Sequence, residues 1–269
     1  MTVKLEFEKK PKVILALNDS LIMIKRSSTH IVRNMDQLLG TFFQPIMFLV
    51  LFVSVFGGAV SEALPPGVSY LNFLMAGIIV QTVAFGSTTT AVAVCNDLQK
   101  GIVDRFRSLP MSNLAVLNGH VISDLFRNII STVVMILAGL VLGFRPEASA
   151  SDWLAISGIL LLFTLAFSWL AAIVGLIAKS IEAVQWLTFV FVFPLTFASS
   201  AFVPTQGMNR ILRVFAENQP ITQVIGAVRS LMLGMPIDSY GWKSVVWSVG
   251  ILLISLPLAS WLFRRKTSQ

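Results

Sequence analysis

The segment WLAISGILLLFTLAFSWLAAIVGLIA, residues 153–178, decides the fold of this chain because its 26 residues include no charged side chain. A helix needs roughly 20 apolar residues to cross a hydrocarbon layer about 30 Å thick. A charge at the middle of that layer costs about 2.5–3.5 kcal/mol on insertion scales, so a charge-free stretch of this length is typical of a membrane span. The segment therefore predicts a transmembrane helix.

Five further stretches contain no Asp, Glu, Lys or Arg: 41–60, 70–95, 128–144, 183–203 and 244–263. The stretch 128–144 has only 17 residues, so we expect its helix to begin near Val121. This start leaves Asp124 and Arg127 in the headgroup zone as an i, i+3 pair. The sequence thus predicts an all-α polytopic membrane protein with six transmembrane helices.

The composition of the whole chain agrees with this class. Of its 269 residues, 55% are hydrophobic and 12% are charged, whereas about a quarter of the residues in an average soluble domain are charged. The mean hydropathy of +0.81 is too high for a protein that clothes its whole surface for water. The lone Cys95 has no partner for a disulfide within the chain. Soluble, disordered and disulfide-rich classes are therefore excluded.

The distribution of basic residues predicts the orientation. Fourteen of them lie in the N-terminal arm, in the loop after span two, after span four and in the C-terminal tail, against five in the opposite loops. By the positive-inside rule both termini are cytoplasmic in the plasma membrane, and the excess charge faces lipid or a cytoplasmic partner, not nucleic acid. The chain divides into a cytoplasmic arm (1–38), a membrane domain (39–263) and a basic tail (264–269).

The segment 205–240 is the one ambiguous part of the membrane domain. Pro220 divides it into two amphipathic halves of about ten to fourteen residues, a length typical of re-entrant or interfacial helices. A seventh span here would put the basic tail outside, so we expect two short re-entrant half-helices on the outer side. We expect them to form a lid whose gate residues are Phe202, Pro204, Asn218 and Pro220.

The arm has a helical stripe of apolar residues between positions 14 and 38, with Lys25, Arg26 and Arg33 off the stripe. This pattern predicts an amphipathic helix. It lies either flat in the headgroup layer or against a cytoplasmic partner, and the direct approach to span one favours the first.

The loop after span two contains a second amphipathic helix, at 98–109. Its apolar face could dock in a groove of a soluble partner, or the helix could simply connect two spans. The residues expected to take part in docking are Leu98, Ile102, Asp104, Arg105, Phe106, Arg107 and Leu109.

Neither an energy source nor a catalytic constellation is visible. No Walker pattern occurs, and His30 and His120 stand apart from any cluster of Cys or carboxylates, so a metal site is not expected. The charge-free spans disfavour an ion-coupled carrier, and the missing nucleophile and base disfavour a lipid-modifying enzyme or assembly factor. Neutral residues of spans two and five either line a pathway or permit close helix packing. They are Gln81, Thr82, Phe85, Thr88, Thr89, Thr188, Thr196, Ser199 and Ser200.

Two groups of residues carry a family resemblance. The first is DRFRSLPMSNLAVL at 104–117, with Gly119 and Asp124 downstream; the second is Phe202-Val-Pro204, followed by ENQPIT at 217–222 and AVRSL at 227–231. Together they resemble the type-2 ABC exporter permeases, and among these the drug-resistance permeases of the daunorubicin kind.

The resemblance implies a function. Such a permease is not an enzyme; it pairs with a separate ATP-binding cassette subunit, which binds ATP and magnesium, and two copies of each export a lipophilic drug, lipid or glycan. The resemblance also implies that the arm is the connecting helix, that 98–109 is the coupling helix and that spans two and five line the path.

Overall fold

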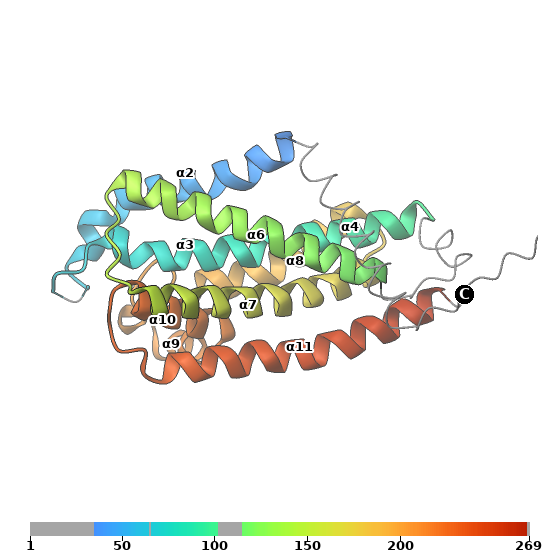
Figure 1. Cartoon of the computed structure of the whole chain (residues 1–269). Helices are drawn as coiled ribbons and strands as arrows, with labels where there is room; N and C mark the ends of the chain where they lie inside the picture. Colours follow the sequence, from blue (N-terminus) through green and yellow to red (C-terminus); the bar gives the residue numbers. More distant parts are fainter. Residues whose placement is uncertain (1–34, 65, 102–114, 268–269) are drawn as a thin grey trace, which may run out of the picture.

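A computed structural model describes residues 35–64, 66–101 and 115–267, and in these residues the chain is helical without any strand. The all-α prediction is therefore confirmed for this part of the chain. The elements, in chain order, are α2 (Met35–Ser61), α3 (Tyr70–Gly86), α4 (Thr88–Gln99), α6 (Ala115–Leu142), α7 (Ala150–Ile177), α8 (Ile181–Phe197), the 3-10 helix η1 (Thr205–Gly207), α9 (Arg210–Asn218), α10 (Pro220–Met232) and α11 (Asp238–Thr267) (Figure 1).

Five stretches of the described chain are long and apolar enough to cross a membrane: Phe42–Ser61, Tyr70–Gln99, Val116–Leu142, Ala150–Ile177 and Asp238–Lys266. They correspond to the predicted spans one, two, three, four and six. Span five is shorter than predicted, because α8 has 17 residues, equivalent to about 25 Å of helix. The count of six spans therefore stays a prediction that depends on α8.

The early end of α8 has a local cause. The Ser199 hydroxyl donates to the carbonyl of Thr196 over 2.5 Å and accepts the N–H of Ala201 over 3.1 Å. This side chain thus replaces the helical bonding that the last turn would otherwise continue. The residues of the turn are small or apolar, so a hydropathy window over 183–203 does not detect the end of the helix.

Serine side chains set the starts of three helices. Ser69, Ser149 and Ser180 accept N–H groups from the first turns of α3, α7 and α8, and Ser149 forms a capping box with Asp152. Such caps satisfy donors that have no partner within the helix.

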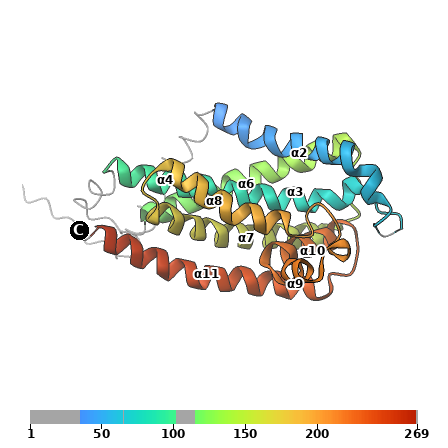
Figure 2. The ribbon, with the colours of Figure 1, turned by 180° about the vertical axis from the view of Figure 1, so that it is seen from behind.

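The helices run along one long axis, with α3, α4 and α7 in the interior (Figures 1 and 2). In an apolar 18-residue stretch of each span, 67% is buried in α3–α4 and in α7, against 11% in α2, 28% in α6 and 17% in α11. The last three helices therefore present most of their apolar side chains outward, as expected for a lipid-facing surface. The backbones of α4 and α7 approach closely at Gly175, where a Cβ atom would lie 2.4 Å from the carbonyl oxygen of Ala91.

The helices α9 and α10 lie at one end of the bundle, and the C-terminal end of α11 lies at the other (Figures 1 and 2). The chain divides at Pro220, which is the first residue of α10. The two halves differ from one another: α10 is buried against α3, α7 and α11, whereas α9 exposes Ile211, Val214 and Phe215. Only α9 therefore resembles the interfacial half-helix expected from the sequence.

Two predicted cytoplasmic features lie outside the described residues. The arm falls in residues 1–34, except for its last four residues, which belong to α2. Most of the predicted coupling helix falls in residues 102–114. Both stay predictions.

Candidate functional site

Span two is broken at its middle, between α3 and α4. The N–H of Thr90 donates to the carbonyl of Ser87 over 3.0 Å, and not to the carbonyl of Gly86 as in a continuous α-helix. The Gly86 carbonyl accepts from side chains instead. These side chains are the Thr89 hydroxyl, at 3.0 Å, and a terminal nitrogen of Arg127, at 2.6 Å. Side chains that enter the hydrogen-bond ladder in this way are a recognised cause of helix breaks.

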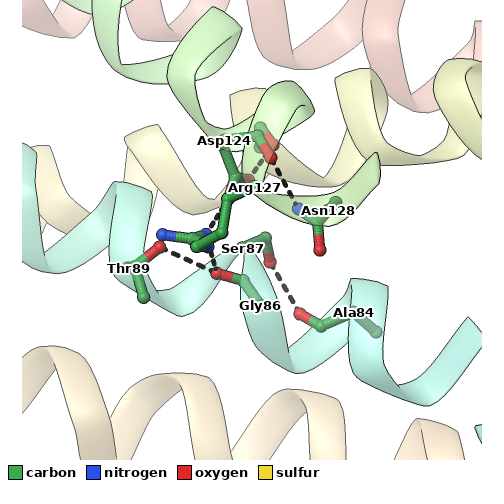
Figure 3. Close-up of polar contacts among 8 residues, drawn as sticks. Ala84, Gly86, Ser87, Thr89, Asp124, Arg127 and Asn128 are labelled. Carbon is green, nitrogen blue, oxygen red and sulfur yellow. Dashed lines mark hydrogen bonds and ion pairs between the residues drawn. The ribbon is translucent and has the colours of Figure 1, made fainter. Parts of the chain in front are cut away.

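A buried ion pair of α6 faces this break (Figure 3). Asp124 and Arg127 bond to each other, and only 2% and 7% of their surfaces are exposed. The second carboxylate oxygen of Asp124 accepts from the hydroxyl of Ser168 in α7, and the Asp124 carbonyl accepts from Asn128 over 3.0 Å. The pair thus joins three helices: α3 at Gly86, α6 and α7.

This geometry corrects one expectation. The helix begins at residue 115 and not near Val121, so Asp124 and Arg127 lie well inside α6, and both are buried against its neighbours. The apolar stretch Val116–Leu142 therefore contains both charges. A pair that neutralises itself and bonds to a free carbonyl removes much of the cost that made such a placement improbable from the sequence.

The C-terminal end of span two, in α4, is tied to its neighbours by polar contacts. The Nε2 atom of His120 lies 2.9 Å from an Asp97 carboxylate oxygen and joins α6 to α4. The amide of Gln99 donates to the carbonyl of Lys179 over 2.9 Å, between α4 and the start of α8. Leu98, the first predicted coupling residue, packs on an inner apolar cluster. The other predicted coupling residues, 102–109, lie outside the described part of the chain.

The N-terminal end of span two, in α3, contacts the predicted gate. The Tyr70 hydroxyl, in the first turn of α3, donates to the carbonyl of Phe202 over 3.0 Å. The ring of Phe202 stacks on Phe52 of α2 and lies against Phe197 of α8, at centroid distances of 4.5 and 4.7 Å. Phe202 therefore joins α2, α3 and α8 at this end of the bundle.

The other gate residues occupy different positions. Pro204 precedes η1, and Asn218 is exposed at the end of α9, where its amide donates to the Val214 carbonyl over 2.8 Å. Neither contacts Phe202 in any described interaction. Of the four predicted gate residues, the structure places Phe202 alone at a junction of several spans.

The ends of α9 and η1 are joined at Glu217. Its carboxylate accepts from Arg213 over 2.7 Å and from the Thr205 hydroxyl over 3.0 Å. The Arg213 hydrogen bond, helped by Thr205, lowers the pKa of Glu217, and partial desolvation opposes that shift. The contact therefore favours the ionised carboxylate.

Two glutamines that the sequence reading did not single out bind α10 to its neighbours. The amide of Gln219 donates to the carbonyls of Leu195 and Ala198 over 2.6 and 3.0 Å, and so caps the end of α8. The amide of Gln223 donates to the carbonyl of Glu217 over 2.5 Å. Gln219 lies in the ENQPIT motif, so the sequence pointed to this segment, but it did not reveal that the Gln219 side chain caps α8.

The predicted pathway residues are covered by neighbouring helices in the single chain. Several bond to their own helix: Thr82 to Ile78 and Thr196 to Val192, each over 2.7 Å. Gln81, Thr82, Thr188, Thr196 and Ser199 are buried, and Phe85, Thr88, Thr89 and Ser200 are partly exposed. Pathway and packing roles both stay open for this set.

Comparison with known proteins gives a consistent family relationship. The profile of the ABC-2 type transporter family matches residues 19–233. The daunorubicin resistance ABC transporter permease protein DrrB1 of Streptomyces coeruleorubidus is 29% identical over 241 residues, covering 87% of this chain and 81% of that protein. A probable doxorubicin resistance permease, DrrC of Mycobacterium tuberculosis, is 24% identical over 91% of this chain and 88% of its own length. A putative transport permease, ycf38 of Porphyra purpurea, is 25% identical over 77% and 71%.

Proposed function

We propose that this chain, which belongs to the ABC-2 type transporter family, is the permease of an exporter driven by a separate ATP-binding cassette subunit. The chain is itself a transporter permease and not an enzyme, as are the relatives named for drug resistance. The proposed cargo is a lipophilic drug, lipid or glycan-type substrate that leaves across the plasma membrane, and the names of these relatives support the drug.

The observation that carries the proposal is that span two, made of α3 and α4, runs from one end of the bundle to the other. At the proposed outer end of this span, the Tyr70 hydroxyl donates a hydrogen bond to the carbonyl of the gate residue Phe202. At the other end of span two, α4 contains Leu98, the first residue of the predicted coupling helix, and ends at Gln99 before a turn at Lys100 and Gly101. A displacement of the coupling helix by the ATPase would be transmitted along span two and through the Tyr70 hydrogen bond to the gate.

The break at Ser87 gives this route a place to bend. ATP binding can shift the gate only if the ATPase contacts the coupling helix differently in the open and closed states. The ion pair of α6 holds the Gly86 carbonyl at the break and so fixes the position of the pivot between α3 and α4.

A second copy of the chain is proposed to pack beside α8. This helix is about 5 Å shorter than a typical hydrocarbon layer, and short spans are accommodated by thinning of the bilayer or by oligomerisation. The outward face of α8 carries large exposed side chains that include Trp186, Phe189 and Phe191. Aromatic side chains of this kind are enriched in protein interfaces.

The direct test is co-purification of the tagged chain with its candidate ATPase, followed by measurement of ATP turnover in the presence of lipophilic compounds. We expect a stable complex whose turnover changes with a transported compound. An ATPase variant that cannot hydrolyse ATP should abolish export. Export that persists with this variant and collapses with a protonophore would refute the proposal in favour of an ion-coupled carrier.

The orientation is tested separately. In a Cys95→Ala background, Gly207→Cys in η1 should react with an impermeant thiol reagent in intact cells, and Ser268→Cys in the tail should not. The reverse labelling pattern would place the termini outside and refute the proposed topology.

A further inference from the structure

A cavity of about 770 Å³ lies at the end of the bundle that carries α9 and α10. Its walls come from the end of α2, the turn around η1, α10 and the start of α11. Cavities of this size, about 300–1,000 Å³, are typical of small-molecule sites. Most of the lining is apolar or small, and includes Val60, Leu64, Val203, Met208 and Met235.

Arg229 is the one charged side chain among the described residues that line this cavity. It is partly buried in α10, although the sequence places it among the charges of the outer loops. Its guanidinium lies 3.6 Å from the centroid of the Phe73 ring and donates to the Phe73 carbonyl over 3.0 Å. It also donates to the carbonyl of Ser200 over 2.6 Å and, at 3.5 Å, to the Ser200 hydroxyl.

All these partners of Arg229 are neutral. No carboxylate of the described chain lies within ion-pair distance of it, in contrast to Arg127 and Arg213. The fixed bonds use three of the five N–H donors of a guanidinium. A partly buried cation without a counter-ion, with donors to spare and an adjoining cavity, is the arrangement that recognises carboxylates and phosphates.

We propose that this cavity binds an amphiphile with an acidic headgroup. The phosphate or carboxylate of the ligand pairs with Arg229, and its apolar part lies against Val60, Leu64 and Met235. The uncompensated positive charge disfavours a cationic amphiphile in the same place. The site is distinct from the predicted pathway residues, apart from Ser200 at its edge.

Two sources can supply such a ligand. Ala59 and Ala63, at the end of α2, line the cavity and are exposed, as are Val203, Gln206, Gly207 and Tyr240, so together these residues mark the rim of its mouth. The ligand is either an acidic phospholipid of the surrounding leaflet or a diffusible acidic amphiphile. The headgroup chemistry is the same for both.

Binding is measured on the full-length chain in nanodiscs of neutral phosphatidylcholine, without the ATPase. One arm adds phosphatidylglycerol to the disc and counts retained lipid by native mass spectrometry. The other arm adds dodecyl phosphate from solution, with dodecyltrimethylammonium as the cationic probe of equal chain length. We expect at least one acidic probe to be bound about tenfold or more tightly than its neutral or cationic counterpart.

Three variants locate the site. Arg229→Gln should weaken binding of the acidic probe by about tenfold or more, because a charge-assisted hydrogen bond is lost. Ala63→Trp should block the mouth and weaken binding while leaving the bonds of Arg229 in place. Arg210→Gln removes the same charge from the exposed start of α9 and should change nothing.

The outcomes discriminate clearly. Binding confined to phosphatidylglycerol identifies a lipid site, and binding confined to dodecyl phosphate identifies a site for diffusible amphiphiles. No preference for acidic probes in either arm would overturn the proposal, as would unaltered binding in Ala63→Trp. That variant also decides the matter if Arg229→Gln does not fold. Because the ATPase is absent, the result is independent of whether export requires ATP.

Discussion

Replacement of Asp124 by Asn tests whether the buried pair of α6 holds the break in span two. The Asp124 carboxylate forms two side-chain contacts, with Arg127 and with Ser168, and both members of the pair are almost fully buried. A hydrogen bond to a charged group contributes about 1.5–3 kcal/mol, so two such contacts contribute about 3–6 kcal/mol. This range agrees with the cost of about 3–5 kcal/mol for breaking a buried ion pair by removal of one partner. We therefore expect the Asp124→Asn substitution to lower the free energy of unfolding by about 3–5 kcal/mol.

The double substitution separates the charge from the contact. Asp124→Leu with Arg127→Met removes both charges at similar side-chain volume, and the Gly86 carbonyl keeps its bond from Thr89. Replacement of a buried pair by apolar residues is often neutral. We expect the double variant to be more stable than Asp124→Leu or Arg127→Met alone, with a coupling energy of about 2 kcal/mol or more.

The assay is unfolding of the detergent-solubilised chain in a denaturant titration, followed by fluorescence of its six tryptophans. Arg145→Gln is the matched control, because Arg145 also bonds to backbone carbonyls but is exposed at the end of α6. It should lose less than about 1 kcal/mol. An Asp124→Asn variant within about 0.5 kcal/mol of the native chain, with additive effects in the cycle, would refute the reasoning.

Three further results are expected. Phe106→Ala should weaken ATPase association by about 2 kcal/mol or more in a pull-down titration, and Arg105→Ala by less, if a buried aromatic anchors the coupling helix; equal effects would contradict this ranking. Gly175→Ala should lower the melting temperature, because its Cβ would meet the Ala91 carbonyl, while Gly158→Ala on the same helix meets nothing and should not. Because the pKa of Glu217 is lowered in the folded chain, its contacts stabilise the fold at pH values above the ordinary pKa of Glu. This stabilisation is lost as the pH falls through the lowered pKa. Hydrogen exchange over 205–218, corrected for intrinsic rates, should therefore rise below about pH 4 in the native chain but show no such step in Glu217→Gln.

The positions of the long helices could be predicted from the sequence because two simple constraints act on them. A span must match the thickness of the hydrocarbon layer and must avoid unpaired charge. The segment 153–178, for example, became α7 at Ala150–Ile177. The end of α8 escaped these constraints, since the hydroxyl of Ser199 ends the helix within a small and apolar sequence.

The polar site depended on contacts that no local pattern encodes. The spacing of Asp124 and Arg127 is visible in the sequence, but Ser168 lies 44 residues from Asp124, and Gly86 lies 41 residues from Arg127. If these partners are left out of account, Asp124 and Arg127 have a lower free energy in the headgroup layer than within the span, because water solvates both charges there. The same reasoning placed Arg229 in an outer loop, because its acceptors, the carbonyls of Phe73 and Ser200, come from distant segments.

The two halves of span two are held by different partners, and this difference makes a pivot at Ser87 physically reasonable. The outer half, α3, is bonded to the gate through Tyr70. The inner half, α4, is fixed to α6 through Asp97 and His120 and packs closely on α7 at Gly175. A force on the proposed coupling helix would therefore move this end of α4 together with α6 and α7. Within span two, side chains replace a backbone hydrogen bond at the carbonyl of Gly86, and such a replacement is a recognised cause of helix bending. The proposed transport cycle thus needs a change of angle at the carbonyl of Gly86, and not a sliding of the whole span against its neighbours.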